Sequence, residues 1–236
     1  MMSSFKGSTR LISLLPFAAL LFAACDSSTG PGVGPQAPSL SSAASYGILA
    51  GTAVSCGGPV GTVSADIGIF PGSSITGFPT CTLSGTQHIA TALAGTAQGN
   101  LTTAYNKLAG MACGTTISAD LGGTTLAPGV YCSASSVGLT GALTLDGQGH
   151  SNAVFVIQSG SALTVAGSVV LIGSAQAKNV FWQVGSSASI GTSSVMKGNI
   201  LALSSISFAT DATLLGRALA RNGAVSLTSN NTITLP

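Results

Sequence analysis

The chain has 236 residues, of which 45% are hydrophobic and only 5% are charged, and it contains 32 Gly and no Glu. This much hydrophobicity argues against a disordered protein, and a mixture so rich in small residues is a poor basis for an ordinary helical enzyme. The formal net charge of +2 is carried by Lys6 and Arg10, so the rest of the chain has no excess of basic side chains for binding nucleic acid.

The N-terminus has the pattern of an export signal. Two basic residues precede an apolar run from Leu11 to Phe22, which is too short to span a membrane. The following Ala23-Ala24-Cys25 completes a sequence that resembles the bacterial lipoprotein signal, in which the cysteine is lipidated after cleavage. We therefore expect a lipoprotein-type signal peptide at residues 1–24 and a lipidated Cys25. Ordinary secretion with cleavage nearby is the alternative, and either route exports the protein, to the cell envelope or the medium.

A tether and a single domain are expected after the signal. Residues 25–39 are rich in Ser, Gly and Pro, which is typical of a flexible linker, and residues 40–236 form the domain. The domain contains four cysteines, and in an exported protein an even set indicates disulfides, with three possible connectivities. We favour Cys56–Cys81 and Cys113–Cys132, because each closes a local loop. No Cys-x-x-Cys spacing supports a metal site, and no cofactor is expected.

A repeated string links the two halves of the domain. Val63-Ser64-Ala65-Asp66-Ile67-Gly68 returns almost unchanged as Ile117-Ser118-Ala119-Asp120-Leu121-Gly122, and a Pro-Gly turn follows each copy. Asp66 and Asp120 could be interpreted as paired catalytic carboxylates. Their position before Ile-Gly or Leu-Gly favours hydrogen bonding to the backbone at a turn instead.

A long helix is predicted between these copies, at about residues 87–109. Apolar side chains there recur at steps of three and four, which is typical of one helix face: Ile89, Leu93, Ala97, Leu101, Tyr105 and Leu108. Thr86 is the expected N-cap, and Gly110 the expected end. Gly95 and Gly99 each cost roughly 1 kcal/mol relative to Ala. We therefore expect the helix to need packing against the rest of the domain.

The C-terminal half repeats a short pattern in which a small hydroxyl residue stands between two apolar residues. The central residues are Thr144, Thr164, Ser189, Ser207 and Ser226, at spacings of 18 to 25 residues. Because side chains alternate across a strand, the apolar neighbours should point inward and the hydroxyls outward. A period near 20 residues in short strands indicates a β-solenoid. Two more strand sets align between these blocks, so each coil should have three strands and a roughly triangular cross-section.

Stretches along the whole domain match a known family in their order. They are Tyr46–Gly51, Ala65–Gly72, Ile75–Phe78, Leu101–Asn106, Leu126–Tyr131, Leu143–Gly149, Asn152–Gln158, Val180–Gly185 and Gly216–Ala220. Together they resemble the microbial ice-binding (antifreeze) proteins built on a discontinuous β-solenoid. The resemblance implies a mostly β fold, a right-handed β-solenoid with one long α-helix packed alongside, and a monomeric protein whose partner is the surface of an ice crystal. It also implies that ice is bound by one flat face lined with Thr, Ser, Ala and Gly.

The aligned repeats predict which residues form that face. The expected set contains the outward hydroxyls, the outward residues two positions later, and two residues added by the resemblance, Thr52 and Ser84. In full it is Thr52, Ser84, Thr144, Thr164, Ala166, Ser189, Gly191, Ser207, Ala209, Ser226 and Thr228. Small side chains lose little rotamer entropy on contact and can hold ordered water that merges with an ice lattice. Adsorbed protein would pin the crystal front and block growth and recrystallisation without catalysis.

Other function classes fit the sequence less well. A polysaccharide-cleaving solenoid needs clustered carboxylates, whereas the Asp residues here are scattered. A cell-surface adhesin or carbohydrate-binding lipoprotein would need exposed aromatic rings, and an exposed Trp182 would favour that alternative. The hydroxyl ladder could also do no more than keep one solenoid face soluble. The membrane is expected to be a partner only through the lipid anchor.

Overall fold

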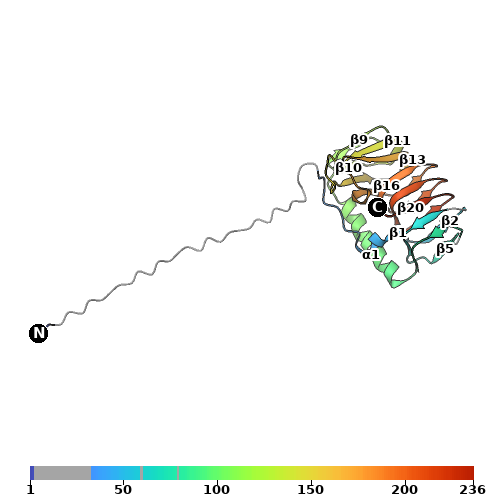
Figure 1. The fold of residues 1–236 in the computed structure, drawn as a ribbon, viewed down its shortest axis with the longest axis horizontal. Coiled ribbons are helices and arrows are strands. Elements are labelled where there is room, and N and C mark those ends of the chain that lie inside the picture. Colours follow the sequence, from blue (N-terminus) through green and yellow to red (C-terminus); the bar gives the residue numbers. More distant parts are fainter. Residues whose placement is uncertain (3–32, 59–60, 79) are drawn as a thin grey trace.

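The computed structural model describes residues 1–2, 33–58, 61–78 and 80–236. The expected signal peptide, Cys25 and most of the tether lie outside these residues. The described chain forms a parallel β-solenoid of 20 strands with one α-helix along its side (Figure 1). No helix within this described part is both long and apolar enough to cross a membrane. The mostly β fold with a single helix confirms the predicted fold class.

Each coil contributes strands to three faces, which we call the helix face, face A and face B. The helix face consists of β8 (Thr115–Thr116), β10 (Gly129–Ser133), β12 (Phe155–Ser159), β14 (Val180–Val184), the ends of β16 (Val195–Ala202) and β18 (Thr213–Ala220), β1 (Tyr46–Ala50), β4 (Asp66–Ile69) and β7 (Gln87–Ile89). Face A consists of the starts of β11 (Val137–Asp146) and β13 (Leu163–Ile172), then β15 (Ala188–Ile190), β17 (Ile206–Phe208), β19 (Val225–Leu227), β2 (Ala53–Cys56) and β5 (Ser74–Thr76). Face B consists of β9 (Thr125–Leu126), the ends of β11 and β13, the starts of β16 and β18, β20 (Thr232–Thr234), β3 (Thr62–Ser64) and β6 (Thr82–Leu83).

The order of the coils along the solenoid differs from their order in the sequence. We number them along the axis: coil 1 (β8, β9), coil 2 (β10, β11), coil 3 (β12, β13), coil 4 (β14, β15, start of β16), coil 5 (end of β16, β17, start of β18), coil 6 (end of β18, β19, β20), coil 7 (β1, β2, β3) and coil 8 (β4, β5, β6). Strand β1 pairs with both β18 and β4, so the first coils in the sequence stack directly on the last one. The C-terminus consequently lies within the stack rather than at one of its ends (Figure 1).

The helix α1 connects the two ends of the stack. It runs from Ala92 to Ala109, is capped by the hydroxyl of Thr91, which accepts a hydrogen bond from the Ala94 amide at 3.2 Å, and ends at Gly110. The predicted start at residue 87 and the predicted Thr86 cap are wrong. Residues 87–89 instead form β7, which adds a last strand beside β4 on the helix face. The cause is that a free strand edge in coil 8 can be paired by this segment.

Two hydrophobic cores hold the coils and the helix together. The larger core fills the solenoid with the inward residues of every coil, including the fully buried Phe155 and Trp182. The second core lies between α1 and the helix face, where Leu101 and Leu108 pack in the same cluster as Phe181. Burying a side chain of this size contributes about 1.5–3 kcal/mol, which more than offsets the glycine cost within the helix. The helix is thus stabilised by packing, as its sequence suggests.

Both ends of the solenoid are joined covalently to the next coil. Cys56 of coil 7 is bonded to Cys81, which precedes β6 of coil 8. Cys113, just before β8 of coil 1, is bonded to Cys132 of coil 2. These are the two local pairings favoured from the sequence. Each disulfide connects a coil that has a neighbour on one side only to one that has neighbours on both.

Candidate functional site

The central column of face A is a ladder of small hydroxyl residues. Parallel pairing places Thr164 beside Ser189, Ser189 beside Ser207 and Ser207 beside Ser226. Their neighbours along each strand, such as Val165 and Ile190, are buried in the solenoid core. The alternation of inward apolar and outward hydroxyl side chains therefore builds the ladder as the repeats predict.

The ladder continues beyond the residues predicted from the sequence. Ser226 pairs with Ser55 of β2, and Ser55 pairs with Thr76 of β5, so coils 7 and 8 extend the same column. At the other end Thr164 pairs with Gly138, which has no side chain. The signal for Ser55 was present, because Val54-Ser55-Cys56 has the same pattern when Cys is counted as apolar. The predicted ladder lacks Ser55 because the aligned repeats are confined to the C-terminal half.

Three predicted residues lie away from this ladder. Thr144 pairs with Val170 and Thr125 on face B, because the chain passes from face A to face B at Gly141, whose φ is +94°. The apolar-hydroxyl-apolar pattern stands in the second half of β11 but in the first half of β13, so aligning Thr144 with Thr164 compares two different faces. Placing Thr144 on face A was therefore wrong.

Ser84 and Thr52 are displaced for related reasons. The Ser84 amide donates to the carbonyl of Val63 at 3.0 Å, which puts Ser84 at the end of the face B strand β6. Thr52 lies in the turn before β2, where its amide donates to Gly223 at 3.2 Å, so it stands at the margin of face A. The column position in that coil belongs to Ser55.

A second column, of Ala, Gly and Thr residues, runs beside the hydroxyl ladder. Ala166, Gly191, Ala209 and Thr228 follow one another from coil 3 to coil 6, held by backbone hydrogen bonds such as Gly191 N to Val165 O at 2.7 Å. Together the two columns border a shallow trough of about 290 Å³. Its lining is Thr164, Val165, Ser189, Ile190, Gly191, Ser207, Phe208, Ala209, Ser226 and Thr228. Every one of these residues is uncharged. Water at this surface therefore meets hydroxyl groups, methyl groups and backbone atoms, and no strongly hydrated ion.

Hydroxyls of both columns are held by hydrogen bonds within the face. The Ser207 hydroxyl donates to the Ser189 hydroxyl across one coil at 3.4 Å, and the Thr228 hydroxyl donates to the Phe208 carbonyl at 3.1 Å. Adjacent coils are spaced by roughly 4.8 Å, the separation of paired strands. Face A thus presents a regular, shallow array whose side chains have few rotamers to lose.

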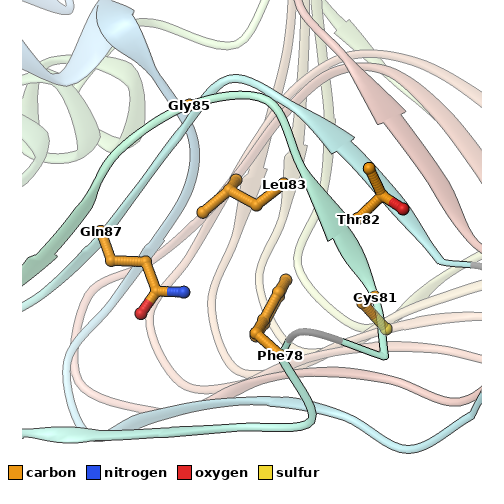
Figure 2. Close-up of a pocket in the computed structure, with 6 residues that line it drawn as sticks. All are labelled: Phe78, Cys81, Thr82, Leu83, Gly85 and Gln87. Carbon is orange, nitrogen blue, oxygen red and sulfur yellow. The ribbon is translucent and has the colours of Figure 1, made fainter.

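A cavity larger than the trough, of about 530 Å³, lies elsewhere, at the open end of coil 8 (Figure 2). Phe78, Leu83 and Gln87 converge on this space, and Thr82 points away from it. The lining residues include no carboxylate, amine or imidazole, and Cys81 is in a disulfide. The cavity is the exposed interior of the terminal coil, where another coil would otherwise stack.

The two aspartates of the repeated string bind backbone amides. Asp66 accepts a hydrogen bond from the Thr86 amide at 2.8 Å, and Asp120 accepts from Gly122 at 2.8 Å and Thr140 at 2.9 Å. The bonds from the Gly122 and Thr140 amides lower the pKa of Asp120. The interpretation as turn-stabilising residues is therefore confirmed. Within the described ranges no group of three His, Cys, Asp or Glu side chains could hold a metal ion.

Comparison with known proteins agrees with the resemblance noted in the sequence. An ice-binding protein of Nostoc sp. (strain HG1) is 46% identical over 194 residues, covering 81% of this chain and 72% of that protein. An ice-binding protein of Flavobacterium frigoris (strain PS1) is 31% identical over 166 residues, covering 67% of this chain and 56% of that protein.

Solved structures give the same assignment. An ice-binding protein from an Antarctic biological consortium matches with a TM-score of 0.83 at 46% identity, covering 86% of this chain and 93% of that chain. An ice-binding protein from the ascomycete Antarctomyces psychrotrophicus matches with a TM-score of 0.81 at 38% identity, covering 85% and 98%. A family model described as ice-binding-like matches residues 48–234. The chain therefore belongs to the ice-binding-like family.

Proposed function

We propose that this protein binds ice through face A and thereby inhibits ice growth and recrystallisation. The observation that carries the proposal is the column Thr164, Ser189, Ser207, Ser226, Ser55 and Thr76, which crosses coils 3 to 8 in strand register. Beside it the smaller column leaves the trough open. No charged side chain lines this trough.

The mechanism follows from the regularity and the size of the side chains. Hydroxyls carried by neighbouring coils, whose strands are spaced by roughly 4.8 Å, can hydrogen-bond a row of water molecules, while the adjacent Ala and Gly positions leave room for that row. Each rung contributes little free energy, but the rungs are fixed relative to one another and engage a solid together. Ice can then grow only between the adsorbed protein molecules, where its surface becomes strongly curved. This curvature lowers the local freezing temperature, so growth stops within the interval that is measured as thermal hysteresis.

The test is to place a bulky ring on the ladder and an equal ring on face B. We expect Thr164→Tyr and Ser207→Tyr to abolish thermal hysteresis in a nanolitre osmometer, because the ring lifts the ladder from the lattice. Thr144→Tyr is the matched control, since Thr144 is an outward residue of face B, and its hysteresis should equal that of the wild type. Circular dichroism should show all three variants folded. Full activity in the two face A variants would refute the assignment of the face.

The adhesin alternative finds no exposed Trp or Tyr side chain among the described residues. The Trp182 side chain is 1% exposed and donates its indole N–H to the Lys197 carbonyl at 3.0 Å. The three tyrosines, Tyr46, Tyr105 and Tyr131, are also buried. Carbohydrate recognition by stacking needs an exposed aromatic face. The described residues therefore offer neither Trp nor Tyr for it.

We also propose that the protein is a monomeric lipoprotein exported to the cell envelope and held in the membrane through Cys25. The apolar run followed by Ala23-Ala24-Cys25 supports this anchor. Its test is metabolic labelling with a fatty acid followed by detergent partitioning. The wild type should carry label and enter the detergent phase. Cys25→Ala should remain unlabelled, and an unlabelled wild type would indicate ordinary secretion instead.

A further inference from the structure

We propose that the N-terminal attachment is built into the corner of the solenoid opposite face A, so that a membrane-anchored molecule holds its ice-binding face away from the lipid. This inference rests on the proposed function of face A and on the proposed anchor at Cys25. It assigns the two partners, a lipid bilayer and an ice crystal, to opposite sides of one domain.

The described chain enters the fold beside coil 3. The Val154 amide donates to the Val33 carbonyl at 2.8 Å, and the Val33 side chain is 9% exposed. Val33, Pro35 and Ala37 border a hollow shared with Asn152 and Asn179. Residues 33–37 therefore lie against coil 3 and the following turn, and their path there is fixed by contacts.

The chain remains bound to the fold as it continues towards the helix. The side chain of Leu40 is buried in the core between α1 and the helix face. The 3-10 helix η2 (Ser41–Ser45) follows. There Arg217 Nε donates to the Ala44 carbonyl at 2.8 Å, and Asn100 of α1 donates to the Ser42 hydroxyl at 2.7 Å. The segment from Val33 to Ser45 is thus bound to the solenoid over its whole length.

This entry point lies at the corner of the solenoid opposite face A. Asp146 ends the face B strand of coil 2, and Phe155 begins the helix-face strand of coil 3. Asn152 and Val154 lie between them, at the corner where face B meets the helix face. In a coil with three faces, this corner is the one that face A does not touch. The N-terminal segment therefore leaves the domain on the side away from the ladder.

The segment between Cys25 and Val33 is short. Cys25 and Val33 are eight residues apart in the sequence, so they can be separated by at most about 29 Å even when fully extended. A lipid on Cys25 keeps the corner close to the bilayer. Because residues 33–45 are bound to the fold, the domain cannot use them as additional slack to turn face A inward. The ladder is then presented to ice outside the cell, and an anchored molecule can attach a membrane to ice.

Orientation can be measured without relying on ice binding. The lipidated full chain is reconstituted in phosphatidylcholine vesicles that contain a headgroup-bound fluorescence quencher, with one dye on an introduced cysteine. Ser151→Cys places the dye at the corner and Ser189→Cys places it on the ladder, and both serines are exposed. We expect strong quenching at position 151 and little at position 189. Equal quenching, or stronger quenching at position 189, would overturn the proposal.

A second measurement separates this proposal from the proposed function. Dye-filled vesicles bearing the unlabelled lipidated chain are exposed to slowly growing ice, and the captured dye is counted. Capture by the wild type and none by Thr164→Tyr is the expected result. Correct orientation without capture would mean that face A does not bind ice, whereas soluble hysteresis with equal quenching at both positions would mean that the anchor does not orient the domain.

Discussion

At the scale of single residues, the corner aspartates show how a solenoid with little charge uses the carboxylates that it has. Asp120 is exposed, yet its Oδ1 accepts the amides of Gly122 and Thr140, which lie on adjacent coils. Donation from these amides favours the ionised form and lowers the pKa of Asp120. Its contribution to folding is therefore complete above the ordinary carboxyl pKa and is lost as the pH falls through the lower, folded-state pKa.

The lowered pKa of Asp120 predicts how the stability of the protein changes with pH. The thermal midpoint of the wild type should fall as the pH decreases between about pH 5 and pH 2. In Asp120→Asn the fall should be shallower, because the amide oxygen can still accept hydrogen bonds but cannot be protonated in this range. Asp211→Asn, which removes a carboxylate from another coil that accepts from the Asn230 side-chain amide at 3.0 Å, serves as the control for general charge loss. An unchanged slope in Asp120→Asn would show that the two amide bonds contribute no pH dependence.

The residue scale also shows how far the site could be predicted from sequence. Seven of the predicted residues line the trough, because apolar-hydroxyl-apolar alternation fixes which side chains point outward. Alternation alone does not say to which face an outward residue belongs. That depends on where the chain turns, which at Gly141 is a backbone bend within one continuous strand. Thr144 was misplaced for this reason.

At the scale of the helix, its two glycines give a controlled pair of substitutions. An alanine Cβ at Gly99 would meet no atom within 4 Å, whereas at Gly95 it would lie 3.3 Å from the Phe70 ring. Gly99→Ala should raise the free energy of unfolding by about 0.5–1 kcal/mol, because alanine loses less backbone entropy in a helix. Gly95→Ala should gain less, since the same benefit is opposed by crowding. Urea unfolding measures both, and an equal gain would contradict the role given to Phe70.

The helix also marks a limit of periodicity as a guide. Its apolar spacing correctly predicted the element and its C-terminal end, but the pattern extended back through Ile89 into what is a strand. Residues 87–89 pair with β4 because coil 8 leaves an unpaired edge there. That edge is a property of the assembled solenoid, so no local window of sequence contains it. Thr91, the actual cap, is an ordinary capping residue, but Thr86 stands earlier in the sequence and fits the longer apolar pattern.

At the scale of the whole molecule, the stack is joined where the sequence is most distant. Strands β1, β2 and β3 pair with β18, β19 and β20, so coils 6 and 7 meet although they stand at opposite ends of the chain. The family resemblance implied a discontinuous solenoid, but the strand patterns did not give the order of coils. Coils 1 and 8 are left with a neighbour on one side only, and these are the coils that the disulfides tie down.

Removing one disulfide at a time should therefore loosen one end at a time. In the chain-entropy account, each closed loop contributes about 3 kcal/mol. We expect Cys56→Ser with Cys81→Ser to lose hydrogen-exchange protection in coil 8, and Cys113→Ser with Cys132→Ser to lose it in coil 1, while coils 3 to 5 stay protected in both. Thr76 and Ser55 belong to the first of these ends, whereas the ladder reaches only Gly138 towards the second. Thermal hysteresis should consequently fall in the first double variant and persist in the second. The reverse order would mean that coils 7 and 8 take no part in binding ice.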